Sequence, residues 1–175
     1  MKHVVLDEFI VELQEFEQRG FDVSEVHAYL SSTRIVPDSL NAYLKYRQDR
    51  YTRHLVHKNA IFEILVICWG TGQSAPIHGH EGQHCWARVE AGSLRFTSYR
   101  EVSETPLVLE QVSEAMVGGC GYLDGPGDIH SVENLPEFGG PAASLHVYYR
   151  PFSECDVYDL QRREKRRVVL DYDPI

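Results

Sequence analysis

Two histidines separated by a single residue, His78 and His80, are the side chains of this sequence best suited to bind a metal ion. In an extended strand successive side chains point to opposite faces, so both imidazoles would lie on one face and could bind the same ion. A third histidine, His130, follows in the segment 127–134. The pair alone is also typical of two histidines on the solvent face of a strand. The surrounding elements must distinguish a metal site from this second interpretation.

Composition and charge limit the classes of partner. The chain has 175 residues and a mass of 20.1 kDa, which suits a single domain over residues 1–175 with its own core. Its formal charge of -9 disfavours nucleic acid and anionic membranes. No apolar run reaches the length of a membrane span, and the four cysteines are scattered. We expect a soluble, cytoplasmic monomer with reduced thiols that acts on a small molecule.

Residues 1–47 are expected to form a helical layer. Apolar residues from Leu6 to Phe16 recur at the spacing of an amphipathic helix, and Gly20 follows where that helix would end. Ser24 can cap a second helix, and Pro37 can begin a third. The pattern predicts about three α-helices that cover one side of a sheet.

Residues 48–175 are typical of an antiparallel all-β core. Short runs rich in Val, Ile, Tyr and Phe alternate with glycine-bearing turns, and no helical pattern long enough for a parallel crossover intervenes. The expected strands are 61–69, 84–90, 93–100, 107–113, 144–150 and 166–171. The basic cluster 162–167 is interpreted as the solvated turn of a terminal hairpin. The spacing predicts a sandwich or barrel.

The order of glycines and histidines resembles the two signature motifs of the cupin superfamily. The matching residues are Gly72, His78, His80 and Gly92 in the first motif and Gly127, His130 and Asn134 in the second. The resemblance implies an antiparallel β-barrel or jelly roll that binds a metal through His78, His80 and His130. Cys85 stands where the first motif usually has a glutamate ligand, and Gly125 stands where the second usually has a proline.

Without the glutamate, the implied site has three neutral imidazoles and open coordination positions. Open positions are typical of catalytic rather than structural metal sites. The set is a variant of the facial iron triad in which histidine replaces the carboxylate. A neutral triad leaves the charge of a divalent ion to be balanced by an anionic ligand such as a thiolate.

With Cys85 in that position, residues from about 50 to 155 resemble the thiol dioxygenases, and the cysteine dioxygenase family in particular. The stretches that carry the resemblance are 51–53, 68–70, 77–80, 84–85, 130–134 and 144–148. The chain departs from the animal members at Tyr149, Arg150 and Pro151, where they have a serine followed by two prolines. The resemblance implies Fe(II) as cofactor and oxidation of L-cysteine by O2 to cysteine sulfinic acid.

The same resemblance assigns roles to residues around the metal. Arg53 would hold a substrate carboxylate through two parallel hydrogen bonds, with Tyr51 on the same face of its strand. Trp69 matches an aromatic residue of the family's pocket, although the end of an apolar strand is equally typical of a core tryptophan.

Ser144, His146 and Tyr148 alternate along one strand, so their side chains would form a hydrogen-bonded row on one face. In the family the tyrosine end of this row lies near the iron, and the histidine orients it from behind. Cys85 matches a position whose sulfur is joined covalently to this tyrosine in many members, so we expect a Cys85–Tyr148 thioether. The remaining cysteines, Cys68, Cys120 and Cys155, are expected to be inert.

Two other functions remain open on the sequence. One is a dioxygenase of another small thiol acid such as 3-mercaptopropionate; Arg53 argues against it, because that branch tends to carry glutamine there. The other is a non-catalytic cupin that binds a small ligand.

Overall fold

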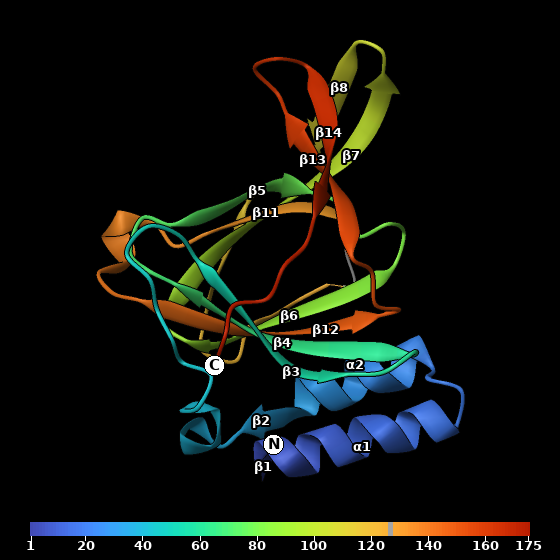
Figure 1. The fold of residues 1–175 in the computed structure, drawn as a ribbon, viewed down its shortest axis with the longest axis vertical. Helices are drawn as coiled ribbons and strands as arrows, with labels where there is room; N and C mark the ends of the chain where they lie inside the picture. Colours follow the sequence, from blue (N-terminus) through green and yellow to red (C-terminus); the bar gives the residue numbers. More distant parts are fainter. Residues whose placement is uncertain (126–127) are drawn as a thin grey trace.

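Two facing β-sheets with helices on one side form the protein, whose computed structural model describes residues 1–125 and 128–175 (Figure 1). The five-stranded sheet has the order β10 (Leu123–Asp124), β6 (His84–Ala91), β12 (Ala142–Tyr149), β4 (Phe62–Trp69) and β3 (Thr52–Lys58). The seven-stranded sheet has the order β14 (Glu164–Val169), β13 (Glu154–Asp159), β5 (Ser74–His78), β11 (Ile129–Glu133), β7 (Ser93–Glu104) and β8 (Leu107–Gln111), with β9 (Met116–Gly119) also paired to β7.

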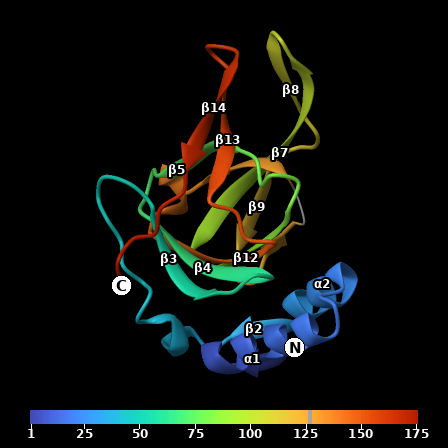
Figure 2. The same ribbon diagram turned by 45° about the vertical axis from the view of Figure 1, so that its right-hand side comes forward.

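Every strand pair in these two sheets is antiparallel, as the sequence predicts for the barrel. Each of the six predicted strands is present, with ends shifted by a few residues. The short strands β9, β10 and β11 have no clear alternating pattern and were not predicted. The basic cluster 162–167 lies in the β13–β14 hairpin, which projects with β7 and β8 away from the helices (Figure 2).

The helical layer is shorter than predicted. It contains α1 (Leu6–Gln18), α2 (Val23–Ser32) and the four-residue 3-10 helix η1 (Pro37–Leu40), so the third predicted α-helix does not form. Two short strands, β1 (Lys2–Val4) before α1 and β2 (Thr33–Ile35) after α2, pair in parallel. A second 3-10 helix, η2 (Pro136–Phe138), follows β11. Among the described residues, no helix is long and apolar enough to cross a membrane.

The cap of α2 also differs from the prediction. Asp22, rather than Ser24, is the N-cap residue, and its carboxylate accepts hydrogen bonds from the backbone N–H groups of Ser24 and Glu25 at 2.9 and 3.0 Å. The helix therefore begins at Val23. A carboxylate at the N-cap satisfies two free amide groups of the first turn, which an uncharged hydroxyl two residues later cannot do from inside the helix.

The central strands β4 and β12 are buried on both faces, which explains their long apolar runs. Phe62, Ile64 and Val66 of β4 face the helices and pack with Phe9 and Leu13 of α1. The alternate residues of both strands belong to a second cluster between the two sheets. The helices therefore cover the outer face of the five-stranded sheet, and its inner face is left to form the interior of the barrel.

A buried arginine joins the helical layer to this sheet. Arg88 of β6 donates hydrogen bonds to the carbonyl oxygens of Leu30 and Thr33 at the end of α2, at 3.1 and 2.9 Å. It also pairs with Glu90, and only 1% of its side chain is exposed. The Thr33 carbonyl oxygen also accepts from Arg34 at 2.8 Å, so removal of Arg88 would leave the Leu30 carbonyl group and the buried Glu90 carboxylate without their charged donor.

We predict that Arg88→Met lowers the free energy of unfolding by about 3 to 5 kcal/mol, the cost of breaking a buried ion pair. The matched control is Arg95→Met, because Arg95 of β7 pairs with Glu133 at 2.7 Å but is 36% exposed. The control should cost less than about 1 kcal/mol. Urea denaturation of both variants measures the difference, and equal costs would contradict the structural role of Arg88.

Candidate metal centre and substrate pocket

The three predicted metal ligands lie together on the inner face of the seven-stranded sheet. His78, the last residue of β5, is directly opposite His130 in the pairing of β5 with β11. His80 lies in the turn after β5, where its backbone N–H donates to a carboxylate oxygen of Asp128 at 2.8 Å. The ligand atoms of the three histidines all lie within 4.8 Å of one another. This spacing lets one ion reach all three with small side-chain movements.

The hydrogen bonds of two of these rings direct a lone pair toward the cluster. The Nδ1 atom of His78 lies 2.8 Å from the carbonyl oxygen of Pro76, and that of His130 lies 3.3 Å from a carboxylate oxygen of Asp124. Since Nδ1–H is the donor in both bonds, Nε2 carries the lone pair. The Nε2 atom of His130 is buried and has no hydrogen-bond partner among the described residues, as expected of a metal ligand.

Burial, with the neighbouring His130, lowers the pKa of His78 to about 3. The His78 imidazole is therefore neutral near pH 7 and available to bind a cation. The donor set, its spacing and the buried nitrogen of His130 all fit a divalent metal that prefers nitrogen ligands.

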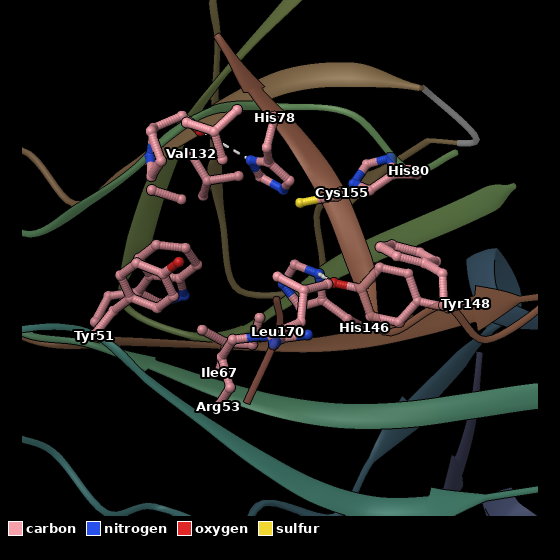
Figure 3. Close-up of a pocket in the computed structure, with 15 residues that line it drawn as sticks. Tyr51, Arg53, Ile67, His78, His80, Val132, His146, Tyr148, Cys155 and Leu170 are labelled. Carbon is pink, nitrogen blue, oxygen red and sulfur yellow. Dashed lines mark hydrogen bonds between the residues drawn. The ribbon is translucent and has the colours of Figure 1, made fainter. Parts of the chain in front are cut away.

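A small cavity of about 50 Å³ lies beside the histidines, between the two sheets. Figure 3 shows His78 and His80 on one side of it and Arg53 and His146 on the other. The lining residues are Tyr51, Arg53, Ile67, Trp69, Ala75, Pro76, His78, His80, Val132, His146, Tyr148, Phe152, Cys155, Val157 and Leu170. Most of them are apolar, and the volume admits only a molecule with few non-hydrogen atoms.

The predicted row on β12 is present, and Trp69 of β4 adds a further member at its Ser144 end. Trp69 donates from Nε1 to the Ser144 hydroxyl at 2.9 Å, and that hydroxyl lies 2.8 Å from Nε2 of His146. Nδ1 of His146 lies 3.3 Å from the Tyr148 hydroxyl. Trp69 is thus a hydrogen-bonded member of the site, and its ring also stacks on Tyr51 with centroids 4.9 Å apart.

The row has a direction because tryptophan can only donate. The Ser144 hydroxyl accepts from Trp69 and uses its own hydrogen for Nε2 of His146. His146 then donates from Nδ1 to Tyr148, which leaves the phenol hydrogen for another acceptor. Burial lowers the pKa of His146 and raises that of Tyr148, so both groups are neutral near pH 7.

Cys85 lies just behind the cavity wall. It is directly opposite Tyr148 in the pairing of β6 with β12, and both residues are buried. Burial raises the pKa of the Cys85 thiol, so the sulfur remains protonated. In an antiparallel sheet, directly opposite residues point to the same face, so the thiol and the phenol lie side by side.

Several residues near the site carry no signal in the sequence. Asp124 and Asp128 contact His130 and His80; Asp124 ends the two-residue strand β10 and Asp128 directly precedes β11, and neither segment has a periodic pattern. Cys155, expected to be an inert core or loop thiol, lines the cavity, and burial raises its pKa, which keeps the thiol protonated. Leu170 comes from a segment that the prediction assigned to the last strand.

The departure at Gly125 has a local reason. Its φ angle is +113°, and an added Cβ would lie 2.2 Å from the Cys85 carbonyl oxygen. Only glycine fits this close approach to β6. Gly127, the glycine of the second motif, lies outside the described residues. At Tyr149 and Arg150, where the chain departs from the animal members, the peptide bond between the two residues is cis.

We predict that His130→Ala abolishes stoichiometric binding of a divalent metal, and that Asp124→Asn weakens binding about tenfold or more by loosening the orientation of His130. His84→Ala is the control, because His84 is half-buried at the start of β6 and its ring stacks on Tyr149 away from the cluster. Elemental analysis and competitive titration with a metal indicator measure the effect. Unchanged affinity in both site variants would exclude this cluster.

Comparisons with known proteins agree with this geometry. The family model described as cysteine dioxygenase type I matches residues 2–162. Cysteine dioxygenase type 1 of Bos taurus is 31% identical over 162 residues, which cover 91% of this chain and 80% of the bovine protein. The Homo sapiens protein of the same name matches to the same extent, and that of Danio rerio is 31% identical over 98% of this chain and 88% of its own.

Two solved structures overlap with part of the fold. One is a conserved protein with a double-stranded β-helix domain from Klebsiella pneumoniae, 15% identical with a TM-score of 0.45 over 63% of this chain and 81% of that chain. The other is an RmlC-like cupin protein from Desulfovibrio desulfuricans, 17% identical with a TM-score of 0.42 over 62% and 90%. We base no conclusion on these two similarities.

The family match spans most of the chain, and the relatives share close to a third of their residues with it. It includes the three clustered histidines and the row on β12. The chain therefore belongs to the cysteine dioxygenase type I family.

Proposed function

We propose that this protein is an Fe(II)-dependent thiol dioxygenase that oxidises L-cysteine with O2 to cysteine sulfinic acid. The observation that carries the proposal is a cluster of three histidines, two of which line a cavity with a guanidinium on its other side. Membership of the family supports a dioxygenase. The identity of the metal as Fe(II) and of the product as cysteine sulfinic acid is our proposal. The small volume of the cavity supports a substrate the size of an amino acid.

The bound Fe(II) would supply redox chemistry with O2 and favour the thiolate form of a coordinated substrate. His78, His80 and His130 would hold it. Their neutral imidazoles leave its charge available to an anionic substrate sulfur.

Arg53 would bind the substrate carboxylate through two parallel N–H groups, which orients the thiol toward the histidines. Tyr51 and Trp69 stack on each other beside it and exclude water from that wall. The carboxylate, rather than the amine, is thus the group that this wall recognises.

Tyr148 would donate its phenol hydrogen to a reacting oxygen or sulfur atom. His146 holds the phenol in place from the other side, and Ser144 and Trp69 fix the ring of His146. Because Tyr148 stays protonated when buried, it can donate over the whole neutral pH range.

Oxygen uptake tests the function directly. Protein loaded anaerobically with Fe(II) should consume O2 with L-cysteine and form cysteine sulfinic acid, and Arg53→Ala should raise KM by about tenfold or more because a paired hydrogen bond to the carboxylate is lost. Arg47→Ala is the control, since Arg47 pairs with Asp49 on the surface. Faster turnover of 3-mercaptopropionate would identify the other thiol acid as substrate, and no thiol-dependent uptake would leave a non-catalytic cupin.

We also propose a Cys85–Tyr148 thioether, supported by the direct opposition of these residues in β6 and β12. The bond forms when the thiol hydrogen and a ring hydrogen beside the phenol hydroxyl are lost as two protons and two electrons. O2, the co-substrate of the proposed reaction, accepts the electrons.

Intact-protein mass after turnover should therefore be lower by the mass of two hydrogens, and Cys85→Ser should abolish this decrease. Cys68→Ser is the matched control, because Cys68 is equally buried but lies on the helix side of β4. A decrease that persists in Cys85→Ser would contradict the assignment of the thioether.

We propose in addition that the chain acts as a single-domain monomer in the cytoplasm. All four cysteines are free thiols, and three of them are buried, which suits a reducing compartment.

A further inference from the structure

The segment Leu170–Asp173, which we call the strap, follows β14 and runs along the free edge of β3 (Figure 1). Its first residue is fixed by a hydrogen bond from the Leu170 N–H to the Ser153 carbonyl oxygen at 2.8 Å. The family match ends at residue 162, so the strap lies beyond the matched region. Leu170 lines the cavity beside Arg53 (Figure 3).

Asp173 fixes the strap to the backbone of Arg53. The Asp173 N–H donates to the Arg53 carbonyl oxygen at 2.7 Å, and the Asp173 carboxylate accepts the Arg53 N–H at 2.9 Å. The same carboxylate is paired with both terminal nitrogens of Arg50, and only 8% of its side chain is exposed. A carboxylate held by three N–H groups and nearly buried is a firm anchor.

The two residues between these anchors contact the side chain of Arg53. The Asp171 carbonyl oxygen accepts a hydrogen bond from a terminal nitrogen of Arg53 at 3.1 Å. The Tyr172 ring lies 5.8 Å from the centre of the guanidinium. Tyr172 is itself held through its hydroxyl, which donates to Glu63 at 2.7 Å and accepts from Lys58 at 2.6 Å.

These contacts matter because a free arginine side chain loses rotamer entropy when it is fixed. A guanidinium that is already held by a carbonyl group and an aromatic ring avoids this loss when a ligand binds. The strap occupies one of its five N–H groups and leaves the rest available to a carboxylate.

We propose that the strap is a positioning element for carboxylate recognition, in which Asp173 holds the segment in register so that Asp171 and Tyr172 fix the Arg53 guanidinium toward the cavity. This inference rests on the proposed function, in which Arg53 binds the substrate carboxylate. Asp171, Tyr172 and Asp173 act through Arg53 and touch no reacting atom.

The test uses the full chain loaded with Fe(II). Asp173→Ala should raise KM for L-cysteine about tenfold with kcat changed less than about twofold, because only binding of the carboxylate is affected. Asp49→Ala is the control, since it removes a carboxylate that is paired with an arginine shortly before β3 but forms its side-chain hydrogen bonds with Arg47 and not with the strap. Its KM should equal that of the wild type.

A double-mutant cycle separates positioning from a general structural effect. If the strap acts through the Arg53 side chain, Asp173→Ala should raise KM no further in an Arg53→Ala background. A full additional rise there would overturn the proposal, and so would an unchanged KM in Asp173→Ala. If Asp173→Ala does not fold, Asp173→Asn replaces it, because the amide oxygen can still accept the Arg53 N–H while the charge pair with Arg50 is lost.

Anaerobic calorimetric titration with L-cysteine provides a readout besides turnover, and weaker binding in the Asp173 variant is the expected result. A wild-type protein without thiol-dependent oxygen uptake would refute the proposed function. An active wild type with equal KM and equal affinity in the Asp173 variant would refute the strap alone.

Discussion

The pairing of β12 with β4 on one side and β6 on the other is the constraint on which the site depends. In this register Tyr148 is opposite both Glu63 and Cys85, and His146 is opposite Leu65 and Ala87. A shift by one residue would turn the polar row toward the helices and bring Leu145 and Val147 into the cavity. The apolar contact between Leu145, Val147 and the helical layer therefore determines where the chemistry can occur.

Charge is distributed unevenly around the cavity. Among the described residues that line it, Arg53 alone carries a permanent charge. His78, His146 and the Tyr148 phenol are neutral because burial disfavours their charged forms. A cavity of this kind favours an anionic ligand over a neutral or cationic one of the same size. The whole chain has a net charge of -9, opposite in sign to the Arg53 guanidinium. The preference for an anionic ligand is therefore confined to the cavity.

The sequence predicted the parts of the site that depend on strand periodicity. The row of Ser144, His146 and Tyr148 follows from alternation along β12. His78 and His80 follow from the motif spacing, because β5 ends at His78 and His80 lies after the strand rather than in it, contrary to the prediction of one extended strand. Asp124 could not be predicted in the same way, because its contact with His130 joins β10 and β11, which belong to different sheets. The third helix was overestimated: Leu40, Tyr43 and Leu44 have helical spacing and pack on the core, but a segment this short is marginal as an α-helix, and only the 3-10 turn η1 forms.

The sequence likewise did not show which residues of the barrel strands face the helices. A run that is buried on both faces, as in β4, shows no alternation, so the sequence reveals a strand but not which residues point inward. Only the register with β12 and the contacts with α1 make the distinction. For the same reason Trp69 could not be assigned to core or site until its hydrogen bond to Ser144 was known.

The strap gives the pocket an order of assembly during synthesis. Arg53 and the Asp171 carbonyl group that holds it are 118 positions apart in the chain. At 5 to 20 residues per second the ribosome needs roughly 6 to 24 seconds to make the intervening segment. Through that interval the nascent barrel can gather its histidines and its polar row, while the wall beside Arg53 stays open. The wall that would bind a substrate carboxylate is thus completed only after residue 171 has been made.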